Sequence, residues 1–183
     1  MSAQIKVPST AVADGKETPV SLEVHHEVEQ FLFHEAGLLD SRQYKLWLQL
    51  LTEDVQYRVT ARVIRDAAAD PIDYAIIDEA RGGLNSRVAQ ISNPRLTRAE
   101  NPPSFTRRLI ANIRTVTGDR AEEVRVISAF LAYRGRAGLL EGGFYVGERS
   151  DVLRRIDGSW RLARRLVRLD QTMVFDGALS VLL

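Results

Sequence analysis

Residues 144–175 read FYVGERSDVLRRIDGSWRLARRLVRLDQTMVF, and this stretch predicts two long strands joined by a tight turn. The turn falls at Asp157-Gly158, a pair that suits the positive φ angles of a two-residue hairpin. Arginine and aliphatic residues mix on both faces of the two strands, which is unlike a sheet with one simple solvated face. We therefore expect the charges of this hairpin to meet another surface, inside the chain or on a partner.

The arginines have two kinds of candidate partner. Glu148, Asp151 and Asp170 offer internal ion pairs, and arginine is also enriched at protein interfaces. Nucleic-acid binding is disfavoured because the net charge is +1 and no array of stacking aromatic residues accompanies the arginines. Arg107 and Arg108 are adjacent in another predicted strand, so they point to opposite faces and one of them is expected to meet a partner or a buried carboxylate. The hairpin residues expected to divide between internal pairs and subunit contacts are Arg149, Arg154, Arg155, Arg164 and Arg165.

The segment before the sheet has a helical pattern. Apolar residues recur at steps of three and four over residues 21–39 and predict a helix. Asp40 is expected to cap a second helix, with Gln43 completing a variant of the capping box. Two successive helices are therefore predicted at the start of the fold.

Strand patterns dominate the remainder. Alternation over residues 54–63 predicts a strand, whereas weak periodicity over residues 72–91 predicts a helix that Gly82-Gly83 interrupts. Loops are expected at 67–71 and 93–103. Helices followed by consecutive strands indicate an α+β fold with the helices on one sheet face. The later strands, which form an antiparallel meander, are predicted at 105–117, 121–136, 140–156 and 159–169.

Composition limits the classes of function. The chain has 183 residues, 45% hydrophobic and 27% charged, which suits one globular domain over residues 21–183 after a flexible polar arm at residues 1–20. Cysteine is absent, so this chain cannot supply a disulfide, a cysteine nucleophile or thiolate ligands for zinc or iron–sulfur clusters. We find no signal-peptide pattern and no long apolar run, and we expect a cytoplasmic protein with no membrane contact.

The candidate metal ligands are the histidines His25, His26 and His34. The first two are adjacent and point about 100° apart on a helix, and the last two are separated by roughly 12 Å of helix rise. Neither pair, with Glu29 or Glu35 added, forms the two-histidine, one-carboxylate site of non-heme iron. We therefore expect structural or solvated histidines and no metal site.

The candidates for acid–base chemistry are Asp54, Tyr57 and Asp73. Asp54 more simply begins a strand, and Tyr57 lies on an alternating apolar face where it more simply packs. No catalytic residue is expected in this chain.

Four parts of the chain carry a resemblance to a known family. They are VEQFLFHEAGLLD with WLQLLTEDVQYRV (28–40 and 47–59), NPPSFTRRLIANI (101–113), SAFLAYRGR (128–136) and YVGERSDVLRRIDGSWRLARRLVRLDQ (145–171). They resemble the small (beta) subunit of bacterial aromatic-ring-hydroxylating dioxygenases of the biphenyl, cumene and naphthalene type. The chain departs from the usual DPPSRTR pattern of such relatives at Asn101 and Phe105.

The resemblance implies an NTF2-like (cystatin-like) cone, in which N-terminal helices pack on a strongly curved antiparallel sheet. It also implies that the large (alpha) subunit carries a Rieske [2Fe-2S] cluster and a mononuclear Fe(II), with NADH as the ultimate reductant. The small subunit carries no cofactor and no metal. Three copies of each subunit would form a hetero-hexamer with a trimer of small subunits.

The sequence is therefore interpreted as a non-catalytic structural subunit that supports the large subunit in cis-dihydroxylation of an aromatic hydrocarbon. The alternative is a free-standing NTF2-like isomerase, dehydratase or small-ligand-binding protein, which predicts a polar cluster deep in the cone. The residues expected at subunit interfaces are Arg107, Arg108, Arg149, Arg154, Arg155, Arg164 and Arg165.

Overall fold

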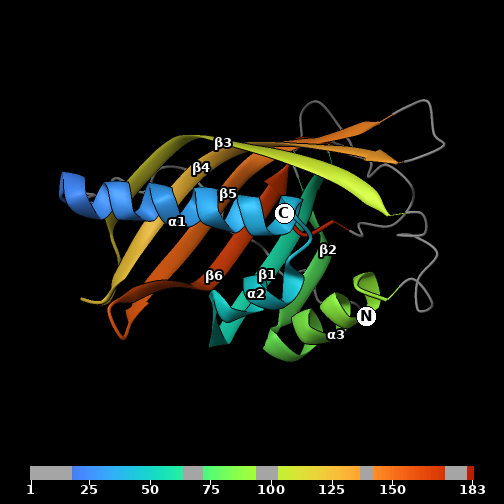
Figure 1. Cartoon of the computed structure of the whole chain (residues 1–183). Coiled ribbons are helices and arrows are strands. Elements are labelled where there is room, and N and C mark those ends of the chain that lie inside the picture. Colours follow the sequence, from blue (N-terminus) through green and yellow to red (C-terminus); the bar gives the residue numbers. More distant parts are fainter. Residues whose placement is uncertain (1–17, 64–71, 94–102, 137–141, 172–180) are drawn as a thin grey trace, which may run out of the picture.

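A computed structural model describes residues 18–63, 72–93, 103–136, 142–171 and 181–183. In this part of the chain one curved sheet has the strand order β2-β1-β6-β5-β4-β3, and α1 lies across one of its faces (Figure 1). The elements in chain order are α1 (Leu22–Asp40), α2 (Tyr44–Gln49), β1 (Leu51–Val63), β2 (Ile72–Ala80), α3 (Arg81–Ile91), β3 (Ser104–Thr117), β4 (Glu123–Arg136), β5 (Gly143–Ile156) and β6 (Ser159–Leu169).

Helix α1 has the predicted apolar stripe. Its N-cap is Ser21, whose hydroxyl accepts a hydrogen bond from the Val24 amide at 3.3 Å. Val28, Leu32 and Leu39 are fully buried by the helix's contact with the sheet. Spacings of three and four residues place these side chains on one face, so burial of that face holds α1 on the sheet.

The prediction that Asp40 caps α2 was wrong. Asp40 is the last residue of α1, and Gln43 at the N-cap of α2 makes no side-chain capping bond. The Asp40 carboxylate instead accepts hydrogen bonds from the Arg108 backbone amide at 2.9 Å and from its guanidinium. Arg108 is buried, and a buried cation needs a charged partner more than an exposed helix end needs a cap.

Residues 72–91 form a strand and a helix, where the sequence predicted a single interrupted helix. Residues 72–80 are β2, which pairs antiparallel with β1 with Ile77 opposite Val59. Pairing with β1 satisfies the backbone of this segment and outweighs its weak helical periodicity. Helix α3 begins at Arg81 and contains Gly82-Gly83 in its first turn, so the change of structure precedes the glycines.

The predicted meander is confirmed. Strands β3, β4, β5 and β6 pair antiparallel in succession, and the β5–β6 turn has φ angles of 51° at Asp157 and 77° at Gly158. Strand β6 then pairs parallel with β1, with Val59 beside Val167. This pairing joins the β1–β2 pair to the meander in one six-stranded sheet. The sheet therefore joins the N-terminal and C-terminal parts of the chain at its centre.

The predicted loops and arm fall mostly outside the described residues. Thr18 and Pro19 are described, and they lie along the edge strand β3, where the Thr117 amide donates to the Thr18 carbonyl at 3.0 Å. In the described part of the chain, no helix is both long and apolar enough to cross a membrane. The α+β arrangement expected from the sequence, with helices against one curved sheet, is observed (Figure 1).

Candidate functional site

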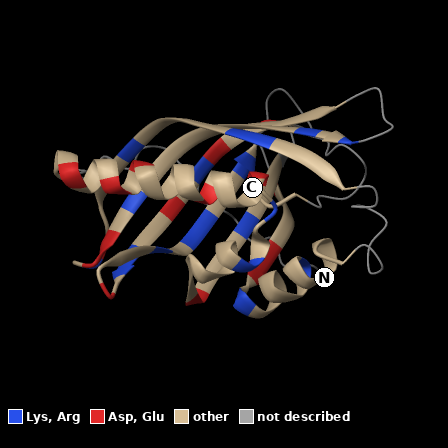
Figure 2. Ribbon diagram, in the orientation of Figure 1, with Lys and Arg blue, Asp and Glu red and all other residues tan. Residues whose placement is uncertain are grey.

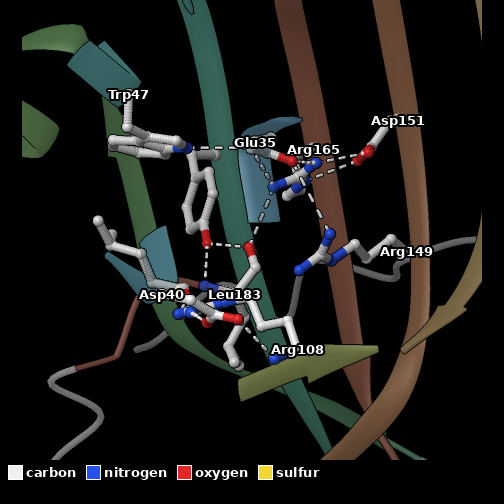
Figure 3. A network of polar contacts seen from close by, with 10 residues as sticks. Glu35, Asp40, Trp47, Arg108, Arg149, Asp151, Arg165 and Leu183 are labelled. Carbon is white, nitrogen blue, oxygen red and sulfur yellow. Dashed lines mark hydrogen bonds and ion pairs between the residues drawn. The ribbon is translucent and has the colours of Figure 1, made fainter. Parts of the chain in front are cut away.

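Four buried charged residues meet between α1 and the strands β5 and β6 (Figure 3). We call Glu35, Arg149, Asp151 and Arg165 the inner cluster. Arg165 donates to the Glu35 carboxylate through Nη1 at 2.8 Å and Nη2 at 2.7 Å. It also donates to Asp151 through Nε at 2.9 Å and Nη2 at 2.7 Å. One guanidinium thus holds two carboxylates by two-point contacts, the geometry in which arginine pairs most strongly.

The sheet and the helix bring these residues together by their regular spacing. Asp151 on β5 lies opposite Arg165 on β6, so both side chains point to the same face of the sheet. Arg165 is two residues before buried Val167, which places it on the inward-facing side of β6. Glu35 is three residues after Leu32 on α1 and so lies on the buried stripe of that helix.

The charges of the inner cluster keep Glu35 ionised. Burial alone raises the pKa of Glu35, but the charges of Arg165 and Arg149 and the hydrogen bonds from Arg165 and Trp47 bring it below its ordinary value. The Trp47 indole donates to Glu35 at 3.0 Å. Burial lowers the pKa of Arg165, yet its two carboxylate partners raise it well above the ordinary value. Neither group changes protonation near neutral pH, so this pair is suited to structure and not to acid–base catalysis.

The three acid–base candidates do not come together. Asp54 pairs with Arg154 at 3.0 Å on an exposed part of the surface, and Asp73 pairs with Arg168 at 3.2 Å. Tyr57 lies in the interior, where burial raises its pKa. Each candidate is therefore used in a different local contact.

The histidines also lie in separate contacts. His25 Nδ1 is 3.1 Å from the Thr115 hydroxyl, and His26 Nδ1 is 3.6 Å from the Glu29 carboxylate. Glu35, a candidate ligand in the sequence, belongs to the inner cluster. Among the residues with described positions, no three histidine or carboxylate side chains gather as a metal site would require. A Rieske cluster needs two cysteines, and this chain has none, so its residues do not fit that group.

Most of the arginines predicted at interfaces make contacts within the chain. Basic and acidic residues lie on the same strands of the sheet (Figure 2). Arg154 pairs with Asp54 and with Glu123, and Arg155 pairs with Glu27 and stacks on Trp160. The buried members of the set are Arg108, Arg149 and Arg165, and the exposed members are Arg107 and Arg164. The geometry therefore favours Arg107 and Arg164 as the members that remain accessible to a partner.

The outer face of the sheet exposes a group of large apolar residues. Phe105 is 71% exposed and Leu109 is 59% exposed, both on β3. Leu109 lies opposite Leu131, and Leu131 lies opposite Val146, so the group continues as a row across β3, β4 and β5. We use the name outer patch for the exposed residues Phe105, Leu109, Tyr133, Phe144 and Val146.

Residues of the outer patch contact one another across neighbouring strands. Tyr133 and Phe144 are opposite each other, and their ring centroids are 5.3 Å apart. Arg107 lies between Phe105 and Leu109 on β3 and opposite Tyr133, which places a cation among the residues of the patch. Exposed apolar groups that include an arginine are typical of surfaces that bind other proteins.

Asp151 was expected to pair internally with the hairpin arginines, and its pair with Arg165 confirms this, but the sequence did not reveal that Glu35 completes the inner cluster. Its members are distant in the chain, with Glu35 and Arg165 separated by 130 positions. Period-two counting from Val167 and Leu169 places Arg165 on the buried face, and this was the available signal. The polar cluster that the alternative interpretation predicted is therefore present, but its charges are paired with one another.

The comparisons with known proteins agree over most of the chain. The model of a family described as ring hydroxylating beta subunit matches residues 34–176. The beta subunit of biphenyl 2,3-dioxygenase from Rhodococcus jostii (strain RHA1) is 35% identical over 183 aligned residues, which cover 94% of this chain and 95% of that protein.

Solved structures share the fold. Naphthalene 1,2-dioxygenase with indole bound in the active site matches with a TM-score of 0.81 and 24% identity, covering 90% of this chain and 88% of that chain. The beta subunit of benzoate 1,2-dioxygenase from Burkholderia mallei matches with a TM-score of 0.65 and 20% identity, covering 84% and 93%. A structure described as a scytalone dehydratase from Novosphingobium aromaticivorans matches with a TM-score of 0.59 and 19% identity, covering 82% and 86%. Together these likenesses confirm the NTF2-like α+β fold class expected from the sequence.

Proposed function

The chain belongs to the family of ring-hydroxylating dioxygenase beta subunits, as its sequence segments predicted, and from this premise we propose that it is a non-catalytic supporting subunit. Its role is to hold the large subunit in a productive assembly. The large subunit carries the Rieske cluster and the mononuclear iron and performs cis-dihydroxylation of an aromatic hydrocarbon with NADH as the ultimate reductant. The biphenyl relative supports an arene as the substrate class.

The observation that carries this proposal is the outer patch. Phe105 and Leu109 are large apolar side chains held on a rigid sheet face and open to solvent. Burying apolar area of this kind favours association because it removes apolar surface from water. Arg107, between Phe105 and Leu109 on β3, supplies a charge that selects and orients the partner. We assign the outer patch and Arg107 to the subunit interface of the complex, with Arg164 as a second exposed contact.

The non-catalytic role is supported by the ion pairs of the buried carboxylates. Glu35 and Asp151 are both engaged by Arg165, and Glu35 is held ionised. A general acid or base needs a pKa near the working pH and an accessible proton. Glu35 has neither feature, and Asp151 is buried against Arg165, which favours assembly over chemistry as the role of this chain.

The assembly is proposed to contain three large and three small subunits, with the small subunits forming a trimer. Closed symmetric rings of this kind require each interface to be repeated in every copy. The compartment proposed is the cytoplasm.

Co-expression with the large subunit from the same operon tests the proposal. We expect native mass spectrometry to detect a complex with equal numbers of the two chains, and iron only in preparations that contain the large subunit. The chain alone should bind no iron. A homo-oligomer that ignores the large subunit, or turnover by the small subunit alone, would contradict the proposal.

A further inference from the structure

Residues Val181, Leu182 and Leu183 lie inside the cone. Their exposed fractions are 6%, 1% and 0%, so all three aliphatic side chains are buried in the core. Figure 3 shows Leu183 among the polar side chains of the interior, between Arg108 and the inner cluster. None of the three residues belongs to a strand of the sheet. The segment therefore occupies the interior as a ligand would, without strand pairing.

Side chains from three strands recognise the backbone of this segment. The Tyr57 hydroxyl on β1 accepts from the Leu183 amide at 2.7 Å and donates to the Leu183 carbonyl. Arg165 on β6 donates to the same carbonyl at 3.3 Å. Arg108 on β3 donates to the Leu182 carbonyl at 2.6 Å. The interior thus combines an apolar space for two leucine side chains with several converging donors, the composition of a small-molecule site.

Arg149 is the member of this interior whose hydrogen-bonding capacity is unused. Its residue is 0% exposed, and Nε, Nη1 and Nη2 have no hydrogen-bond partner among the described residues. The nearest carboxylate is Glu35, 3.8 Å from Nη1, and the face of Phe130 lies 5.0 Å from the guanidinium carbon. Burial, followed by the charge of Arg165, lowers the pKa of Arg149 to about 10, so it remains a cation at neutral pH.

A second unpaired polar group lies next to Arg149. Ser128 on β4 is opposite Arg149 on β5, and its buried hydroxyl has no hydrogen-bond partner in the described part of the chain. A buried polar group without a partner destabilises the fold, and a ligand that hydrogen-bonds to it removes this penalty. A carboxylate has two acceptor oxygens, which suits a guanidinium and a hydroxyl on one sheet face.

We propose that the cone interior is a binding site for a small aliphatic carboxylate, and that residues 181–183 are its resident occupant. In this site Arg149 and Ser128 bind the carboxylate. The apolar space that Leu182 and Leu183 fill takes the aliphatic group, so the ligand and the segment compete. This site lies in the interior of the small subunit alone, so ligand binding there can be tested independently of the outer patch and of the proposed assembly.

Binding of 4-methylpentanoate to the full-length Leu183→Gly variant tests the proposal. This acid carries the branched aliphatic group of leucine on a carboxylate, and the variant opens the apolar space while keeping the chain. We expect calorimetry to show saturable binding at least tenfold tighter than to the unsubstituted chain. The uncharged 4-methylpentanamide should bind at least tenfold more weakly than the acid. Equal binding of acid and amide would overturn the assignment of a carboxylate site.

A second substitution in the same background identifies the anion-binding group. Arg149→Met should weaken 4-methylpentanoate binding at least tenfold, whereas Arg120→Met removes an arginine that is 70% exposed and should leave it unchanged. Methionine fills similar space, Glu35 keeps its two hydrogen bonds from Arg165 in this variant, and circular dichroism checks that the variant folds. Ser128→Ala, which deletes only an unpaired hydroxyl, should weaken binding about threefold. Binding that survives Arg149→Met, or no binding by Leu183→Gly or by a chain ending at residue 180, would refute the proposal.

Discussion

Glu35 connects the helix to the sheet through a single carboxylate. It accepts from Arg165 at 2.8 and 2.7 Å and from the Trp47 indole at 3.0 Å, and it is fully buried. Replacing one partner of a buried ion pair leaves the other charge uncompensated, which typically costs about 3–5 kcal/mol. We therefore expect Glu35→Gln to lower the free energy of unfolding by about this amount at pH 7, as measured by urea denaturation.

The same substitution should change the response to acid. The pKa of Glu35 is lower in the folded chain than its ordinary value of 4.5, so its ionised form stabilises the fold above that pH. This stabilisation is lost as the pH falls through the folded-state pKa. Between pH 5 and pH 3 the Glu35→Gln variant should therefore lose less additional stability than the parent. Parallel curves for the two chains would show that Glu35 does not contribute to the acid response.

Glu53→Gln is the matched control for Glu35→Gln. The Glu53 side chain is 90% exposed and lies 3.8 Å from Arg81. Exposed ion pairs contribute about 0–1 kcal/mol because solvent and salt screen them. We expect little change in stability and an unchanged acid response.

Single residues show where sequence reasoning reached its limit. Asp40 followed by Gln43 satisfies a local capping pattern, yet the Asp40 carboxylate binds Arg108, 68 positions away. The sequence around Asp40 contains no information about Arg108, a buried cation on a strand that is distant in the chain. The same reason applies to Glu35 and Arg165, whose contact depends on how α1 lies on the finished sheet.

At the scale of elements, the close approach of β5 and β6 at Gly147 requires a residue without a side chain. A Cβ atom added to Gly147 would lie 2.0 Å from the Arg168 carbonyl oxygen, far inside van der Waals contact. Both atoms belong to paired backbones, so neither can move without shifting a strand. We expect Gly147→Ala to destabilise the chain by about 1–3 kcal/mol or more. Amide hydrogen exchange should increase first along β5 and β6.

Gly37→Ala provides the contrasting case. Gly37 lies within α1, and an added Cβ would meet nothing within 4 Å. Alanine in a helix interior is more stable than glycine by about 0.5–1 kcal/mol because it loses less backbone entropy on folding. We expect this variant to melt at a higher temperature than the parent. A loss of stability in Gly37→Ala, or none in Gly147→Ala, would contradict the geometric argument.

The elements differ in how well the sequence predicted them. The four strands of the meander were found because their alternation is long and their turns carry glycine or aspartate, as at Asp157-Gly158. Strand β2 was missed because its residues 72–80 include both helical and strand spacings. Pairing with β1 decides between them, and that pairing is a property of the assembled sheet. The local pattern was therefore sufficient for the long strands, including the edge strand β3, and failed for the shorter edge strand β2.

At the scale of the whole molecule, the internal ion pairs expected of the hairpin arginines are present, and the outer face of the sheet adds exposed apolar residues that were not expected from the sequence. The hairpin arginines were predicted to divide between internal pairs and subunit contacts, and Arg154, Arg155 and Arg165 are held by internal carboxylates. The large exposed side chains on β3 are apolar, with Phe105 and Leu109 prominent. In the proposed interface, Arg107 lies among the apolar residues of the outer patch, and arginine and aromatic residues are both enriched at the core of known interfaces.

The outer patch gives the prediction that tests assembly directly. Leu109→Ser combined with Val146→Ser removes two side chains from one row across the sheet while leaving the buried face untouched. Residues at the centre of an interface each contribute about 1–2 kcal/mol or more, so we expect association with the large subunit to weaken at least about tenfold. Tyr74→Ser on β2 changes a residue that is 66% exposed outside the patch and should have no effect on association. Native mass spectrometry of dilution series measures both, and circular dichroism of the isolated chains checks their folding. Unchanged association of a folded Leu109→Ser/Val146→Ser chain would show that the large subunit binds elsewhere, and the interface would then have to be sought around Arg164.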